Sequence, residues 1–276
     1  MTIAERIAGA TLTPAERRVG ELVAASPSLV AFGTVAEVAA HTGTSGPTVL
    51  RLAQKLGFDG FAALQAAVQG ELESRLRPAA ERIREHDDGH PIGRTLAASL
   101  AAVQATLDGV DRGAFQQAVA LLARRRGAVL VLSGEGTAGV ARTAAEALDL
   151  LRPGVQVVAG SPVTVARRLA HLAPGDVVLA VDVRRYEQAV LDASAAAVKA
   201  GAEVVAVTDS PLSPLADAAT VAFTVRAEGP GPFDTHVGTL ALLDALVAGV
   251  ADRLRTTATP RLDAVERAWS AHLTDD

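Results

Sequence analysis

Apolar side chains in residues 1–77 recur every three or four positions, a spacing that predicts an all-helical segment. The segments Thr13–Glu16 and Thr34–Glu37 both read as capping boxes, each opening a helix. Gly43 suits the left-handed position that ends the second of these helices, and Ser45 is expected to cap a third. The short Gly-containing turn between the second and third helices predicts a helix-turn-helix.

The second half of the chain alternates short apolar runs with helical stretches, which is typical of a parallel sheet with crossover helices. The predicted strands are 128–132, 155–158, 177–181, 204–207 and 221–225. Helices are predicted over 94–126, 138–151, 163–172, 188–200 and 235–254, a short turn over 211–218, and a tail helix over 260–273. Right-handed crossovers would then build a three-layer α/β/α sandwich around five parallel strands.

These patterns predict an α/β protein that begins with a three-to-five-helix bundle. The bundle is assigned to residues 1–77 as a helix-turn-helix domain, and the polar stretch 78–93 to a linker that begins helical and becomes a loop at 87–89. An effector-binding domain is assigned to 94–256 and a C-terminal helical tail to 257–276.

The third helix presents polar side chains that suit contacts with double-stranded DNA. In a helix-turn-helix this helix enters the major groove, where Arg and Gln match the edges of guanine and adenine. Its outward polar residues are expected to be Ser45, Thr48, Arg51, Gln54 and Lys55. The alternative is an ordinary three-helix bundle whose polar face is only solvated.

Charge does not decide between these alternatives. The chain carries a formal net charge of −5, but residues 1–77 hold seven basic and seven acidic side chains, so the excess acid lies elsewhere. A neutral domain binds DNA if its cations share one face, and weakly as a monomer. Strong binding then requires a dimer or a larger assembly.

The stretch from Leu12 to Gln65 resembles, without a gap, the N-terminal domain of RpiR-type transcription regulators. The segment Thr48–Phe58, which reads T-V-x-R-x-x-x-K-L-G-F, is its most specific part. This resemblance implies operator binding through the third helix by a homodimer or homotetramer. The operators would then be inverted repeats.

Residues 128–254 resemble a sugar isomerase (SIS) domain, most clearly in the segments 200–209 and 213–217. The resemblance implies phosphosugar binding at the carboxyl ends of the parallel strands, where ligands of such sheets bind. The candidate effector-binding residues are Ser133, Gly134, Glu135, Gly136, Thr137, Arg184, Arg185, Tyr186, Thr208, Asp209 and Ser210.

Both loops that hold the phosphate in SIS domains are altered here. The serine that usually follows G-x-G-x is Ala138, which leaves Thr137 as the nearby hydroxyl. The usual S-x-S-G-x-T reads Asp-Val-Arg-Arg-Tyr-Glu over 182–187. Arg184 and Arg185 could offset the new carboxylates and hold an anion. Alternatively, Asp182 locks an Arg in place, or the loop is a salt-bridged surface turn without a ligand.

The glycines of residues 134–139 also spell G-x-G-x-x-G, the fingerprint of dinucleotide binding. That fingerprint requires an acidic residue at the end of the second strand, and residues 158–161 contain none. We therefore expect no cofactor, but an anion-binding turn at a helix N-terminus.

The sequence favours a regulator controlled by a small anionic metabolite, a phosphosugar or related carbohydrate derivative, over an enzyme. A phosphosugar isomerase is the competing class, with Glu135, Glu187, Glu228 and His236 as titratable candidates for its base. The chain has no cysteine, and its histidines lack metal-ligand spacing. Without a bilayer-length apolar run or a signal-peptide pattern, a cytoplasmic protein with no membrane partner is expected.

Overall fold

The computed structural model describes residues 3–25, 27–76, 78–84, 89–211, 213–270 and 272. It divides into two compact units, Met1–Glu85 with Ser210–Asp217 and His86–Asp209 with Ala218–Asp276. The change of unit between residues 85 and 86 falls inside the predicted linker. The predicted loop at 87–89 lies outside the described residues except for Gly89, and α8 already begins at Pro91.

Six described helices of the first unit build a small all-helical core. They are α1 (Ile3–Gly9), α2 (Pro14–Ala25), α3 (Pro27–Phe32), α4 (Val35–Thr42), α5 (Gly46–Lys55) and α6 (Phe61–Leu76). The short helices α7 (Ala79–Arg82) and α13 (Pro214–Asp217) are assigned to the same unit but contribute no residue to this core. Val19, Leu52 and Leu64 are fully buried in its apolar cluster. Both predicted capping boxes are present, because Thr13 and Glu16 bond reciprocally, as do Thr34 and Glu37. The structure adds the short helices α1 and α3 and the 16-residue helix α6, which the sequence analysis did not locate.

The second unit contains a five-stranded parallel sheet in the order β2-β1-β3-β4-β5. Its strands are β1 (Val129–Ser133), β2 (Val155–Val158), β3 (Val177–Val181), β4 (Glu203–Thr208) and β5 (Val221–Thr224). Its helical elements are α8 (Pro91–Asp108), α9 (Arg112–Leu122), η1 (Glu135–Thr137), α10 (Ala138–Leu151), α11 (Pro162–Leu169), α12 (Gln188–Lys199) and α14 (Val237–Ser270).

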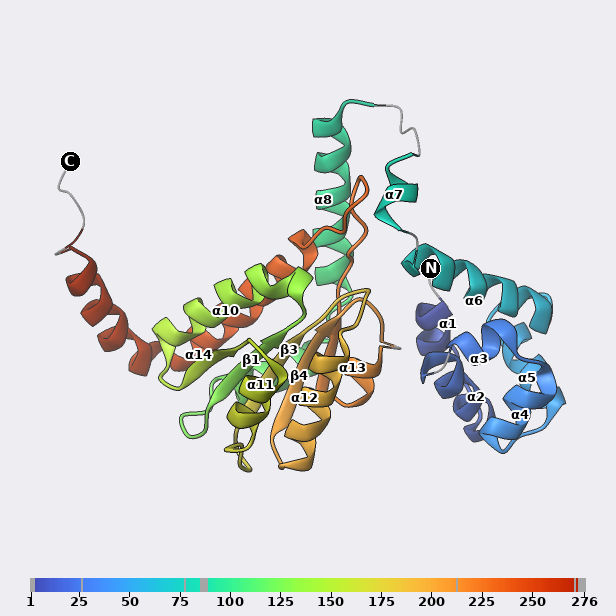
Figure 1. Ribbon diagram of the computed structural model, residues 1–276, viewed down its shortest axis with the longest axis horizontal. Helices are drawn as coiled ribbons and strands as arrows, with labels where there is room; N and C mark the ends of the chain where they lie inside the picture. Colours follow the sequence, from blue (N-terminus) through green and yellow to red (C-terminus); the bar gives the residue numbers. More distant parts are fainter. Residues whose placement is uncertain are drawn as a thin grey trace. The chain divides into compact units, whose positions relative to one another are not determined.

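Helices cover both faces of this sheet, as Figure 1 shows: α10 and α14 lie on one face, α11 and α12 on the other. Alternate strand residues such as Val131, Leu179 and Val205 pack with α9, α10 and α14 in one large core. The alternation of a strand turns their neighbours toward α11 and α12. The predicted α/β/α sandwich with five parallel strands is confirmed.

The C-terminal helix differs from the prediction. We predicted one helix ending near residue 254 and a separate tail helix from Pro260, whereas α14 runs unbroken through Pro260 for 34 residues. Proline removes one helical hydrogen bond and bends a helix, but tertiary contacts can carry the helix through it. Here Leu262 packs on the core, and the Arg261 guanidinium donates to Asp149 O at 2.7 and 2.9 Å.

Replacing Thr34 by Ala is expected to lower the free energy of unfolding by about 1 kcal/mol, the usual cost of a lost helix cap. Thr34 Oγ1 accepts from Glu37 N at 3.3 Å, and the Glu37 carboxylate accepts from Thr34 N at 2.7 Å. Thr11→Ala is the control, because Thr11 is exposed and its hydroxyl forms no hydrogen bond within the described part of the chain. Urea denaturation followed by circular dichroism measures both, and equal losses would contradict the expectation.

Candidate functional site

The helix-turn-helix is formed by α4 and α5, joined by residues 43–45. Gly43 has φ of 58° and ψ of 38°, the left-handed conformation predicted for it, and its N–H closes the end of α4. Ser45 is extended, as an N-cap residue should be. These local signals fix the short turn and thereby the start of α5.

One face of α5 is buried and the other is open. Val49, Leu52 and Ala53 are fully buried in the apolar core. The exposed residues of α5 and its cap are Ser45, Pro47, Leu50, Arg51, Gln54 and Lys55. Four of the five residues predicted to face outward therefore do so.

Thr48 corrects the prediction, because it is only 7% exposed and cannot be a surface contact. It precedes Leu52 by four residues and so continues the buried stripe of the helix. Its hydroxyl lies 3.0 Å from Ser45 Oγ, which satisfies its hydrogen bonding locally. Thr48 thus stabilises the start of α5.

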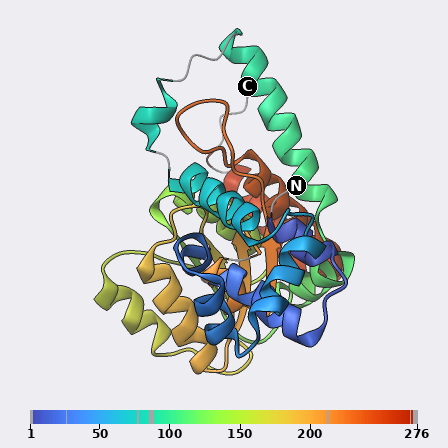
Figure 2. The ribbon, with the colours of Figure 1, turned by 90° about the vertical axis from the view of Figure 1, so that its right-hand side faces the viewer.

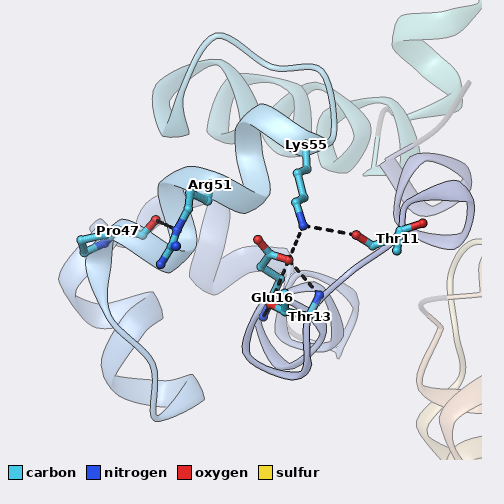
Figure 3. Close-up of polar contacts among 6 residues, drawn as sticks. All are labelled: Thr11, Thr13, Glu16, Pro47, Arg51 and Lys55. Carbon is cyan, nitrogen blue, oxygen red and sulfur yellow. Dashed lines mark hydrogen bonds and ion pairs between the residues drawn. The ribbon is translucent and has the colours of Figure 1, made fainter.

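The two cations of α5 differ in their surroundings, as Figure 3 shows. Lys55 Nζ lies 2.7 Å from Glu16 Oε2 and donates to Thr11 O at 3.3 Å, which ties α5 to the start of α2. The hydrogen bond from Lys55, reinforced by the N–H of Thr13, lowers the pKa of Glu16 to about 2. Arg51 Nε donates to Pro47 O at 3.3 Å, and among the described residues Arg51 forms no ion pair. Of the two cations of α5, Arg51 is therefore the more available to bind an external anion.

The second candidate site lies where the strand order reverses. The chain passes from β1 to β2 on one side and returns to β3 on the other, so the loops after β1 and β3 flank the ligand crevice of such sheets. The first loop contains the half-buried Ser133, the buried Gly134, the exposed Glu135 and Gly136, and Thr137. The second runs from Asp182 to Glu187.

Thr137, expected to be the hydroxyl available in the first loop, is 2% exposed. Its Oγ1 donates to Val181 O at 2.7 Å and lies 3.2 Å from Gly134 O. The Thr137 hydroxyl therefore links the first loop to the end of β3. We predicted that it contacts a ligand, but it is used in a hydrogen bond within the protein.

Backbone N–H groups of both loops are paired with carboxylates of the chain itself. Asp182 Oδ1 accepts from Val183 N at 3.0 Å, and Asp182 Oδ2 from Glu187 N at 2.7 Å. Glu187 Oε1 in turn accepts from Glu135 N. The loop after β1 and the loop after β3 are thus joined through Glu187.

Asp182 is 3% exposed, and its burial raises its pKa to about 6 from a usual value near 3.8. The neighbouring charges of Glu187 and Asp209 raise this pKa further, whereas the N–H groups of Glu187 and Val183 lower it. Asp182 is therefore a carboxylate whose charge is opposed by burial.

The two arginines of the loop after β3 have different roles. Arg184 is buried at 9% exposure, with φ of 67°, an uncommon conformation for any residue but glycine. Its guanidinium pairs with Asp234 at 3.2 Å and with Glu228 at 3.8 Å. The interpretation that Asp182 locks an arginine is therefore wrong. Arg185 is exposed, and its N–H donates to Val183 O at 2.9 Å.

Asp209, after β4, organises the same loop. Its Oδ1 accepts from Arg184 N at 3.0 Å and from the Tyr186 hydroxyl at 2.8 Å. Thr208, the last residue of β4, is fully buried, and Ser210 is buried in the segment that belongs to the other unit. The structure thus brings Thr208 and Asp209 to the same sheet edge as Asp182.

Sequence reasoning missed Asp234 and did not connect Glu228 with Arg184. Both lie more than forty residues after Arg184, in the connection that leads to α14, and no spacing signal marks them. Among the described residues, no cluster of three side chains could hold a metal ion. Within the residues that the structure describes, no helix is long and apolar enough to cross a membrane.

Two family descriptions match the chain. "Helix-turn-helix domain, rpiR family" matches residues 1–75, and "SIS domain" matches residues 121–249. An uncharacterized HTH-type transcriptional regulator of Bacillus subtilis, YbbH, is 26% identical over 93% of this chain and 92% of its own length. The bifunctional protein glk of Burkholderia orbicola is 28% identical over 273 residues, and the chain spans 41% of its length.

Solved structures give the same result for the fold. The sugar isomerase domain of an RpiR transcription factor from Sphaerobacter thermophilus is 29% identical, with a TM-score of 0.59, over 64% of this chain and 98% of that one. The Vibrio vulnificus NanR protein, solved with ManNAc-6P, is 21% identical, with a TM-score of 0.60, over 99% of this chain and 100% of that one. With the two domains in this order, the chain belongs to the RpiR family of helix-turn-helix transcription regulators that carry a SIS domain.

Proposed function

We propose that the protein is a DNA-binding transcription regulator controlled by a small carbohydrate derivative that binds at the switch-point crevice of its SIS domain. The observation that carries the proposal is the exposed face of α5 in a capped helix-turn-helix, with Arg51 and Gln54 on it. A phosphosugar is the effector class that the family implies, and the Vibrio vulnificus NanR protein was solved in complex with one, ManNAc-6P.

Ser45, Arg51, Gln54 and Lys55 are the proposed DNA contacts. Arg51 and Gln54 have the paired donors and acceptors that distinguish guanine and adenine in the major groove. Lys55 is held by Glu16 at 2.7 Å, so it suits a phosphate contact that competes with an existing ion pair. Specificity should therefore depend more on Arg51 than on Lys55.

The test starts by selecting bound fragments from a random pool of double-stranded DNA with the full chain. We expect an enriched inverted repeat, and Arg51→Ala should weaken binding to it by about 1–3 kcal/mol. Fluorescence anisotropy at fixed salt measures the affinity. Arg142→Ala, which removes an exposed arginine of α10, is the control and should bind like the unmodified protein. No enrichment, or equal binding by Arg51→Ala, would overturn the proposal.

We also propose that the chain has no isomerase activity. The relatives from Bacillus subtilis and Haemophilus influenzae carry the names of transcriptional regulators. Of the titratable candidates, Glu187 accepts from Glu135 N, and Glu228 pairs with Arg184 and with Arg226, at 2.9 Å for the latter. These carboxylates are committed to holding the loops. Turnover of sugar phosphates by the full chain would contradict this part.

The proposal includes a homodimer formed through α8. Exposed apolar side chains lie on one stripe of this helix, at spacings of four, four and seven residues. They are Ile92 (73% exposed), Leu96 (58%), Leu100 (62%) and Leu107 (39%). Figures 1 and 2 show the first half of α8 extending beyond the sheet of its own unit. An adjacent side of α8 contacts α14 and buries Ala102 and Thr106.

A second copy of α8 is the occupant that fits this stripe. In an antiparallel pair related by a two-fold axis, the apolar stripe of one copy faces the same stripe of the other, and Leu100 lies close to the axis. The stripe is therefore complementary to itself.

A further inference from the structure

The loops after β1 (133–137) and β3 (182–187) form the seat, our name for the position where the resemblance to SIS domains places a ligand phosphate. In this chain, carboxylates of the protein itself already occupy that position. A phosphate at such a turn is held by backbone N–H groups of the loops. Here the N–H groups of Val183 and Glu187 donate to Asp182, and that of Glu135 donates to Glu187. Two carboxylates of the chain occupy donors that a phosphate requires.

Electrostatics at the seat also disfavours a phosphate. Asp182, Glu187 and Asp209 gather at the end of β3 and β4, and each repels a second anion. The nearest buried cation is Arg184, and it pairs with Asp234 at 3.2 Å and with Glu228 at 3.8 Å. Its charge is therefore balanced before any ligand arrives.

An independent observation indicates that the crevice accepts a ligand. Thr208 is fully buried, and its Oγ1 has no hydrogen-bond partner among the described residues. Buried hydroxyls are rarely left without a partner. Val207 belongs to the core on the α14 side, as does Val181, so the alternation of a strand turns Thr208 and Asp182 to the same opposite face. The unsatisfied hydroxyl thus lies beside Asp182 at the ligand-binding edge of the sheet.

We propose that this crevice binds an unphosphorylated sugar or amino sugar, with Asp182 and Glu187 in the place of a ligand phosphate. Carboxylates accept hydrogen bonds from hydroxyl and ammonium groups, and these bonds are stronger than neutral ones. The Thr208 hydroxyl donates to or accepts from the same ligand. The inference rests on the proposed function and narrows the class of its effector.

The test compares matched pairs of ligands on the full chain by isothermal titration at pH 7.5. The probes are a hexose, a hexosamine, an N-acetylhexosamine and a pentose, each beside its own phosphate ester, together with inorganic phosphate. We expect at least one unphosphorylated member to bind about tenfold or more tightly than its ester, and inorganic phosphate not to bind. An ester that binds more tightly than its parent sugar, or a panel without a bound parent sugar, overturns the proposal.

Two variants show whether the internal carboxylates fill the seat. Asp182→Ser with Glu187→Thr restores the hydroxyls of the family pattern and frees the backbone donors. This double variant should bind inorganic phosphate or a hexose phosphate about tenfold more tightly than the unmodified protein. Thr208→Val keeps the shape of the side chain and should weaken the bound sugar by a similar factor. A double variant that gains no phosphate binding contradicts the inference.

Gly134 supplies a matched geometric control. A Cβ at Gly134 would lie 2.5 Å from Asp182 Oδ1, whereas one at Gly139 would meet nothing within 4 Å. Gly134→Ala should therefore displace the Asp182 carboxylate and weaken sugar binding, and Gly139→Ala should not. Binding of the selected DNA is measured in parallel. If the effector is a phosphosugar, the ligand test fails but the full chain still binds the selected DNA. If the chain binds no DNA, the proposed function itself is wrong.

Discussion

Replacing both Leu96 and Leu100 by Glu is expected to dissociate the dimer into monomers. The same double substitution should also lower the affinity for DNA. These two side chains are 58% and 62% exposed at the middle of the α8 stripe. Burying each in a dimer contributes about 1.5–3 kcal/mol, and an unpaired buried carboxylate costs several kcal/mol. The two-fold interface doubles every change, so we expect the dimer to dissociate about 100-fold more readily or beyond.

Analytical ultracentrifugation at several protein concentrations measures the dimer, and anisotropy on the selected inverted repeat measures DNA affinity. Val163→Glu is the control, because Val163 is 75% exposed on α11 and lies outside the stripe. It should remain dimeric. Unchanged circular dichroism in the double variant shows that α8 still folds against α14. A double variant that stays dimeric would place the interface elsewhere.

Local pattern is enough to predict the sheet. Each strand is a short apolar run, the central strands β3 and β4 are buried on both faces, and each predicted boundary lies within one residue of the observed strand end. The helix between β1 and β2 was predicted with its observed limits, 138–151. Short helices are different, because α1 and α3 have seven and six residues, too few for a helical period to stand out.

Predictions based on the residue type alone are wrong where helical spacing or packing indicates something else. Thr48 was assigned to the DNA face because it is polar, although its spacing from Leu52 places it on the buried stripe. Pro260 was taken as a helix start because proline interrupts helices, yet packing of Leu262 and the anchoring of Arg261 on Asp149 continue α14 through it. In both cases tertiary packing outweighs the local preference.

The effector crevice could be located from the sequence, but its internal pairing could not. The loops after β1 and β3 follow from the strand pattern and the topology rule. That the carboxylate of Glu187 would reach Glu135 N depends on how two loops fifty-two residues apart approach each other. The pairing of Arg184 with Asp234 likewise spans fifty residues and has no local signature. An arginine that reads as an anion-binding group is thereby neutralised.

Asp182→Asn is expected to keep a component of stability that the unmodified protein loses as the pH rises. The pKa of Asp182 is about 6 when folded, against a usual value near 3.8, because burial opposes its charge. The folded protein therefore holds this proton more tightly than the unfolded chain. The resulting stabilisation is complete below about pH 3.8 and is lost as the pH rises through about 6.

Asparagine has the shape of the protonated acid and does not titrate, so the variant keeps at pH 7.5 what the unmodified protein has lost. A difference of about two pKa units corresponds to about 3 kcal/mol. The melting temperature of the variant minus that of the unmodified protein should then rise between pH 4.5 and pH 7.5. Asp217→Asn, at an exposed aspartate of α13, should show no such rise. If the difference in melting temperature does not change with pH, burial does not oppose the charge of Asp182. Asp182 would then have the environment of a solvated surface carboxylate, which contradicts its role as a buried group between the two loops.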